Sequence, residues 1–211
     1  MINKKGQPGK TRSEQAVETR QCLLDTAKKL FATNGYTLTS VRSINRELSM
    51  SDGILYHYFP GGKKEILSVI LREGLQRSFA VMSELNDELE DMPLREALNR
   101  IYWQGDRLFS DDPDLFQILL KESDNLELNE TQLLSDVLLE RTKWFTGFLA
   151  RRYENGEIRE MDFSIASQNF WASSLTNWIG KLLKIEFLRK LESDTDREKI
   201  IEHTLNLWRI P

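Results

Sequence analysis

Two aromatic side chains with polar tips, Tyr56 and His57, stand together in the stretch "SMSDGILYHYFPGGKK", residues 49–64. If this stretch is helical, positions 50, 55, 58 and 59 can face a core. Asp52, Gly53, Tyr56 and His57 must then face outward. An outward tyrosine–histidine pair can donate hydrogen bonds to phosphates or base edges, and a glycine allows close backbone approach. The pattern indicates non-covalent recognition of a nucleic-acid duplex.

The residues on either side extend this surface. Thr39 and Ser40 stand at an expected helix N-terminus, where hydroxyls and free N–H groups bind anions. Ser51 lies at the start of the aromatic stretch, near the expected base edges. Lys63 and Lys64 follow the "PGG" break and could hold a second phosphate. The alternative is a buried aromatic cluster with solvated lysines, and the residue types leave it open.

Catalytic and metal-binding patterns are absent from the sequence. His57 and His203 are the only histidines, and no histidine, cysteine or carboxylate spacing suits a metal ion. There is no nucleophile elbow, no phosphate-binding P-loop and no dinucleotide fingerprint. The acidic runs "NDELED" and "SDDPD" are interpreted as solvated turns. We therefore expect no enzyme activity, no metal and no cofactor.

The surrounding pattern predicts the helices that would position this surface. Apolar residues recur at helical spacing through residues 20–31, and Gly35 can end that helix in a left-handed conformation. Thr39 or Ser40 then caps a second short helix. A turn through Ser49 leads to a third helix, which "PGG" ends. Two short helices joined by such a turn form a helix-turn-helix.

The rest of the chain is also predicted to be helical. Aspartates ahead of prolines in "DMP" and "DDPD", and the capping-box patterns "NETQ" and "TDRE", mark further helix starts. The expected helices span 63–90, 93–110, 113–123, 130–154, 163–190 and 195–208. No strand alternation is present. The sequence predicts an all-α protein of about nine helices.

Charge and composition divide the chain unevenly. Residues 1–74 hold 12 Lys/Arg against 7 Asp/Glu, whereas residues 75–211 hold 17 against 26. A basic end on an acidic body is expected where one end meets a polyanion. The expected organisation is a flexible basic arm over 1–12, a helix-turn-helix domain over 13–62 and a ligand-binding and dimerisation domain over 63–211.

The single cysteine, Cys22, excludes an internal disulfide and is predicted to be a small core residue. The first twenty residues are polar and basic, unlike a signal peptide, and no apolar run approaches the length of a membrane span. We expect a cytoplasmic, nucleoid-associated protein without membrane contact.

The second half is rich in aromatic residues interspersed with small and polar ones. An apolar cavity with a few polar groups is what a small-molecule pocket needs, although an aromatic stripe also fits a solid core. The candidate pocket walls and polar groups are Trp103, Phe116, Trp144, Phe148, Asn169, Phe170, Trp171, Asn177 and Trp178. The last two expected helices carry wide apolar faces that can serve both a core and a partner subunit.

The stretch "RQCLLDTAKKLFATNGYTLTSVRSINRELSMSDGILYHYFPGGKKEIL", residues 20–67, resembles the DNA-binding domain of TetR-family transcriptional regulators. The resemblance implies a three-helix DNA-binding head on a larger helical ligand-binding and dimerisation body. It implies a homodimer formed by the last two helices, and DNA contacts from Thr39, Ser40, Tyr56, His57 and Lys64. Ser49 departs from the family pattern, which has glycine in the turn, and Asp52 stands where the family is often basic or neutral.

The leading hypothesis is a dimeric repressor that binds a palindromic double-stranded DNA operator and is released by a small apolar or amphipathic effector. The first alternative is a nucleoid-associated or architectural DNA-binding protein that needs no ligand. The second is an all-α enzyme or protein–protein adaptor in which the positive charge of the N-terminal region has no function.

Overall fold

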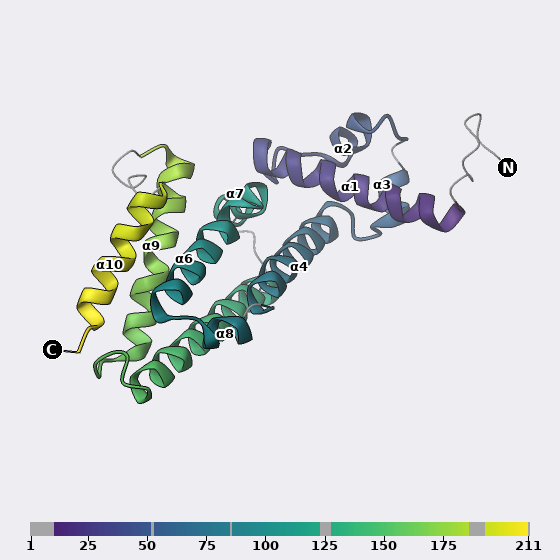
Figure 1. Cartoon of the computed structure of the whole chain (residues 1–211). Helices are drawn as coiled ribbons and strands as arrows, with labels where there is room; N and C mark the ends of the chain where they lie inside the picture. The colour runs from purple at the N-terminus through teal and green to yellow at the C-terminus, as the bar shows by residue number, and fades with distance from the viewer. Residues whose placement is uncertain (1–10, 52, 85, 123–127, 186–192, 211) are drawn as a thin grey trace, which may run out of the picture. The chain divides into compact units, whose positions relative to one another are not determined.

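The structure is a computed structural model that describes residues 11–51, 53–84, 86–122, 128–185 and 193–210. Within these ranges the chain forms ten helices and no strand, which confirms the all-α prediction (Figure 1). The helices are α1 Arg12–Asn34, α2 Val41–Glu47, α3 Ile54–Tyr58, α4 Gly62–Ser83, α5 Asn86–Asp91, α6 Leu94–Ser110, α7 Pro113–Lys121, α8 Leu128–Glu154, α9 Phe163–Leu183 and α10 Asp194–Trp208.

The chain forms two compact units. We call Met1–Gly74 together with Asp114–Glu130 the head unit, and Leu75–Pro113 together with Thr131–Pro211 the body unit. The head unit thus contains α7, which follows α6 of the body unit along the chain. The domain boundaries expected at residues 12 and 62 stay predictions.

In the head unit, α1 begins at Arg12 because a capping box satisfies its first backbone groups. The Thr11 hydroxyl accepts from the Glu14 N–H (3.2 Å), and the Glu14 carboxylate accepts from the Thr11 N–H (2.6 Å). The helix ends at Gly35, as predicted, but the predicted left-handed conformation is wrong: with a φ of 83° and a ψ of 158°, Gly35 has a positive φ and lies outside the left-handed helical region. Its N–H donates to the Phe31 carbonyl (2.9 Å).

One face of α1 is buried through Leu23, Leu24, Ala27 and Phe31, as the apolar spacing predicts. α1 packs on α2, and α2 packs on α3. The prediction for Cys22 is wrong, because its side chain is exposed. The apolar stripe leaves position 22 on the solvent side of the helix.

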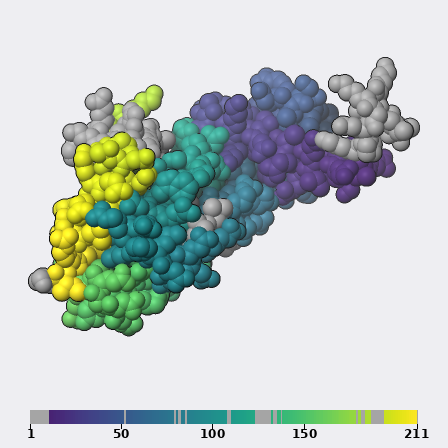
Figure 2. Space-filling model, viewed as in Figure 1, coloured from purple at the N-terminus to yellow at the C-terminus, as the bar shows by residue number. Residues whose placement is uncertain are grey.

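In the body unit, α6 packs against α9 and α10, and Figure 2 shows the side chains of α10 directly against those of α6. The core is aromatic. Tyr102 of α6 meets Phe170 of α9 edge-on at 5.9 Å between ring centroids, and Phe145 of α8 lies 5.2 Å from Phe170. Burial raises the pKa of the Tyr102 hydroxyl to about 12, so it stays neutral.

Four helix boundaries differ from those predicted. α8 begins at Leu128, so Asn129 of the predicted capping box "NETQ" lies inside the helix. The expected helix over 63–90 is two helices, and near the end of α4 the Ser83 hydroxyl donates to the Ala80 carbonyl, a local bond that competes with helix continuation. α9 ends at Leu183 because Lys184 adopts a left-handed φ of 56°. α10 begins at Asp194, capped by Ser193 and not by the predicted box at "TDRE".

No helix in the described part of the chain has both the length and the apolar character needed to cross a membrane.

A buried arginine, Arg152 on α8, fixes the end of α5. One of its terminal nitrogens donates to the carbonyls of Leu89 (3.0 Å), Glu90 (2.9 Å) and Met92 (2.7 Å). The other pairs with Glu157 at 3.0 Å. The last carbonyls of a helix have no partner within that helix, so Arg152 satisfies groups that would otherwise be buried and unpaired.

We predict that Arg152→Met lowers the free energy of unfolding by about 2–4 kcal/mol, because it leaves carbonyls and the Glu157 carboxylate without their donor. Urea unfolding followed by circular dichroism measures this. The matched control is Arg151→Met, which removes the exposed neighbouring arginine that pairs with Glu90 and should cost less than about 1 kcal/mol. Equal losses in the two variants would contradict this account of Arg152.

Candidate DNA-binding and effector sites

The turn between α2 and α3 sets the position of α3, the second helix of the helix-turn-helix and the one we call the recognition helix. The N–H of Met50 donates to the carbonyl of Asn45 (2.8 Å), and the N–H of Ser49 donates to that of Arg46 (3.0 Å). These bonds require Ser49 to adopt a left-handed φ of 54°, a conformation that glycine adopts without a steric penalty. Ser49, which stands where the TetR-family pattern has glycine, therefore occupies a strained position.

At the start of α2, Ser40 is the N-cap, as predicted. Its hydroxyl accepts from the Ser43 N–H (3.0 Å), and the Ser43 hydroxyl accepts from the Ser40 N–H (3.0 Å). The Ser40 side chain is exposed. Thr39 differs, because it is buried and its hydroxyl donates to the Gly35 carbonyl (2.8 Å). Its side chain therefore stabilises the loop between α1 and α2.

On α3, Leu55 and the following Phe59 are buried, while Tyr56 (53% exposed) and His57 face solvent, as the helical spacing predicts. The His57 ring meets Tyr58 edge-on, with 5.0 Å between centroids. A Cβ added to exposed Gly53 would meet nothing within 4 Å, so the start of the helix is open to an approaching ligand.

Gly62 supports Tyr56, a role that sequence reasoning missed. It adopts a φ of +65°, and a Cβ added there would lie 3.1 Å from the Tyr56 ring. A side chain at this position would therefore be strained and would press on the exposed tyrosine. The paired glycines of "PGG" were the available signal, although they indicated only that a helix ends.

The two lysines after the glycines lie in different environments. Lys64 is exposed. Lys63 is partly buried, donates to the Tyr36 carbonyl (2.7 Å) and lies 4.0 Å from the centroid of the Tyr36 ring. Burial lowers the pKa of Lys63, and the nearby Glu122 carboxylate opposes this shift. Lys63 is thus engaged within the head unit.

Two residues at the end of α7 hold the end of α1 and the loop that follows it. The buried carboxylate of Glu122 accepts from the Tyr36 N–H (2.8 Å), and Lys121 donates to the Ala32 carbonyl (2.5 Å). Sequence reasoning missed both residues. No local signal marks them, because their partners lie almost ninety residues earlier in the chain.

Of the nine residues proposed for DNA contact, the structure therefore exposes six on the head unit: Ser40, Ser51, Gly53, Tyr56, His57 and Lys64. Asp52 lies outside the described residues. Whether any of the nine touches DNA stays a prediction.

Several candidate pocket residues lie together in the body unit. Trp144 stacks on Phe148 with 5.6 Å between centroids, and the ring of Phe145 lies 5.2 Å from Phe170 and 6.0 Å from Trp171. These aromatic rings come from α8 and α9. They form one cluster, which fits both a pocket wall and a solid core.

Other candidate pocket residues lie outside this aromatic cluster. Phe116 belongs to the head unit, and Trp103 is partly exposed, with the Arg107 guanidinium 4.7 Å from its ring. Asn177 is buried and donates to Asp106 (3.0 Å). The side chain of Trp178 lies outside what the structure describes.

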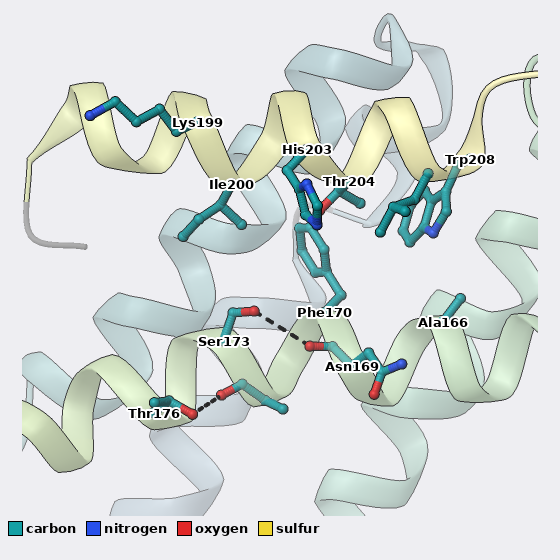
Figure 3. A pocket seen from close by; sticks show the side chains of 12 residues that line it. Ala166, Asn169, Phe170, Ser173, Thr176, Lys199, Ile200, His203, Thr204 and Trp208 are labelled. Carbon is teal, nitrogen blue, oxygen red and sulfur yellow. Dashed lines mark hydrogen bonds between the residues drawn. The ribbon is translucent and has the colours of Figure 1, made fainter. Parts of the chain in front are cut away.

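Asn169 borders a groove of about 580 Å³ between α9 and α10 (Figure 3). Phe170 and His203 point toward each other across it, and Leu207 lies along its α10 side. Apolar side chains on both helices are exposed, including Ile165 (56%), Leu175 (41%) and Leu207 (54%).

A helix-turn-helix with an exposed polar-aromatic recognition surface, joined to a separate helical body, defines a class of protein: the DNA-binding transcriptional regulators. Comparison with known proteins gives the family. Residues 23–70 match the family described as "Bacterial regulatory proteins, tetR family". Residues 23–70 therefore carry the DNA-binding domain of a tetR-family transcriptional regulator.

Similar proteins cover most of the chain. The fatty acid metabolism regulator protein of Bacillus subtilis is 28% identical over 164 residues, which are 74% of this chain and 81% of the relative. The structure of a tetR-family regulatory protein from Rhodococcus RHA1 superposes with a TM-score of 0.69 at 19% identity, over 92% of this chain and 98% of that one. The transcriptional regulator FadR from Bacillus subtilis, in complex with stearoyl-CoA, gives a TM-score of 0.62 at 21% identity, over 89% and 96%.

The strained turn leads to a stability prediction. Ser49→Gly should raise the free energy of unfolding by about 0.5–1 kcal/mol, because the left-handed penalty it removes exceeds the added entropy of an unfolded glycine. Ser49→Ala is the matched control: it keeps the Cβ and should change stability little. Urea unfolding of the three proteins compares them. Equal stability of the glycine and alanine variants would show that the turn stores no such strain.

Proposed function

We propose that this regulator is a homodimeric repressor that binds a palindromic operator and that a small apolar or amphipathic effector releases it. The exposed Tyr56–His57 pair on α3, held by the buried Leu55 and Phe59, is the observation that carries the DNA half of the proposal. Phenol and imidazole tips on an exposed helix suit hydrogen bonds to phosphates and base edges in the major groove.

The proposed contacts fall into two kinds. Ser40, Lys64 and Tyr56 act on phosphates, and Ser51, Asp52 and His57 lie nearest the base edges, where each good contact contributes about 1–3 kcal/mol of discrimination. Gly53 permits close approach. Thr39 and Lys63, the other two residues predicted to contact DNA, are proposed to act by holding the loop between α1 and α2, because both donate to its carbonyl groups.

Lys64→Ala should weaken binding to operator and to random DNA alike, and should reduce the slope of log K against log salt by about one unit. Lys143→Ala, which removes an exposed lysine from α8 in the body unit, is the matched control. Fluorescence anisotropy with labelled duplexes over a salt series measures both quantities. An unchanged affinity and slope for Lys64→Ala would contradict the proposed placement of the head unit on DNA.

The exposed apolar face on α9 and α10 supports a C₂ homodimer. A face with Leu175 and Leu207 both more than 40% exposed is costly in water and suits a second copy of itself. In such a dimer the two α3 helices would lie one turn of DNA apart, about 34–36 Å, or somewhat further.

Leu207→Glu and Leu175→Glu should shift the protein towards monomer at micromolar concentration, because each places a charge at the proposed apolar interface. Leu139→Glu, at an equally exposed position on α8, should leave the assembly unchanged. Sedimentation velocity reports the state, and circular dichroism checks folding. A wild-type protein that sediments as a monomer would contradict the proposed homodimer.

The effector half of the proposal rests on the aromatic cluster in the body unit and on the likeness to a regulator that binds stearoyl-CoA. α4 begins beside the recognition helix with Lys63 and Lys64, and its residues after Gly74 belong to the body unit. An effector that favours a body conformation with a tilted α4 would move the heads. A tenfold shift needs a difference in binding energy of about 1.4 kcal/mol between the two conformations.

Mapping the sites occupied in the genome separates this function from the ligand-independent alternative. One or a few sites beside genes whose transcription falls when the protein binds would support the repressor. Many dispersed sites with no effect on transcription would support the nucleoid-associated protein.

A further inference from the structure

The interior of the body unit contains a cation that has no counter-ion among the described residues. Arg141 of α8 is 7% exposed, and its two terminal nitrogens donate to the amide oxygens of Asn86 and Gln104, the latter at 2.9 Å. Neither partner is charged, and no described carboxylate pairs with the guanidinium. Burial lowers the pKa of Arg141 to about 10, so at neutral pH the side chain remains a buried positive charge.

Two indole rings lie beside this charge. The guanidinium carbon lies 4.2 Å from the centroid of the Trp144 ring and 5.5 Å from that of Trp171. Such contacts offset part of the cost of burying a cation, but they supply no negative charge. The positive charge therefore lies against two aromatic rings.

In the described structure, buried hydrogen-bond donors without partners occur on Arg141 itself and on residues of α6 and α9 near it. The buried Nε of Arg141, Nε2 of Gln104, Nε1 of Trp171 and Oγ of Ser174 have no partner within the described structure. The three nitrogens can only donate, and the hydroxyl can donate as well as accept. Most buried polar groups in folded proteins are paired, so several unpaired donors around one cation indicate a missing acceptor.

A glycine brings two of these groups close to α6. A Cβ added to Gly105 would lie 2.7 Å from the Trp171 ring and 2.9 Å from the Ser174 hydroxyl. No other residue could stand at position 105 without moving Trp171 or Ser174. The next acid along α6, Asp106, accepts from Asn177 (3.0 Å) and is not paired with Arg141.

We propose that Arg141, Gln104, Trp171 and Ser174 bind an oxyanion, the carboxylate or phosphate of an amphipathic effector. An oxyanion accepts several hydrogen bonds at once and supplies the charge that the guanidinium lacks. The acidic character of the chain as a whole argues against an anionic effector, and the buried arginine overrides it locally. This inference rests on the proposed function, since it specifies the effector of that repressor.

The test compares ligands that differ only in the head group. Dodecanoate, dodecyl phosphate, 1-dodecanol and dodecyltrimethylammonium are titrated into wild-type protein, with binding followed by the intrinsic tryptophan fluorescence. Release of an operator duplex is measured in parallel. The two anions should bind roughly tenfold to hundredfold more tightly than the alcohol, as expected for charge-assisted hydrogen bonds. The difference between dodecanoate and dodecyl phosphate identifies which oxyanion the site prefers.

Arg141→Met should abolish the preference for the anions, because methionine keeps much of the volume and removes the charge. Arg141→Lys should retain part of the preference, since lysine supplies the charge without the planar set of donors. Arg151→Met, at an exposed position on the same helix, is the matched control and should behave as wild type.

Equal binding of anions and alcohol by the wild-type protein, or an unchanged preference in Arg141→Met, overturns the inference. So does failure of both anions to bind. If the alcohol or the ammonium compound still releases the operator, the proposed function survives without the anion site. If no compound of either charge binds or releases the operator, the effector half of the proposed function fails as well.

Discussion

A recognition helix of five residues cannot hold its own orientation, and the head unit is built around this constraint. Isolated helices shorter than about 12–15 residues are marginal in water. α3 is therefore positioned by its buried residues, Leu55 and the following Phe59, and by the turn bonds to the carbonyls of Asn45 and Arg46. With the apolar side chains fixed inward, Tyr56 and His57 have no orientation left except outward.

The loop between α1 and α2 is the second part of this support. It receives a buried hydroxyl from Thr39, an ammonium from Lys63 and a carboxylate from Glu122. The last comes from the end of α7, which follows α6 after only two intervening residues. The chain itself thus connects a helix of the body unit to the loop that leads into the helix-turn-helix.

The interior of the body unit contains both an aromatic core and a group of buried polar side chains. The rings of Tyr102, Phe145 and Phe170 form a close-packed aromatic core. The one polar group on these three rings, the Tyr102 hydroxyl, stays neutral. The same unit contains the Arg141 guanidinium, which has no carboxylate partner among the described residues, and several buried donors without acceptors there. A folded protein whose only requirement was stability would replace such groups with apolar ones at little cost. Their presence is the basis of the proposed oxyanion site.

The sequence by itself determined the class of fold and the recognition surface. Helical spacing, the cap at Ser40 and the stop at Gly35 are local effects that act within about four residues along the chain, so they could be predicted without a structure. The outward direction of Tyr56 and His57 followed in the same way from the positions of their apolar neighbours.

Only the tertiary structure decided which polar groups meet. Glu122 reaches Tyr36, Arg141 reaches Gln104 and Arg152 reaches the end of α5 across separations of 86, 37 and about 60 residues. No periodicity or cap encodes such pairs, because they depend on how whole helices pack. The same holds for Cys22, exposed where its residue type favours burial, and for the split between α4 and α5.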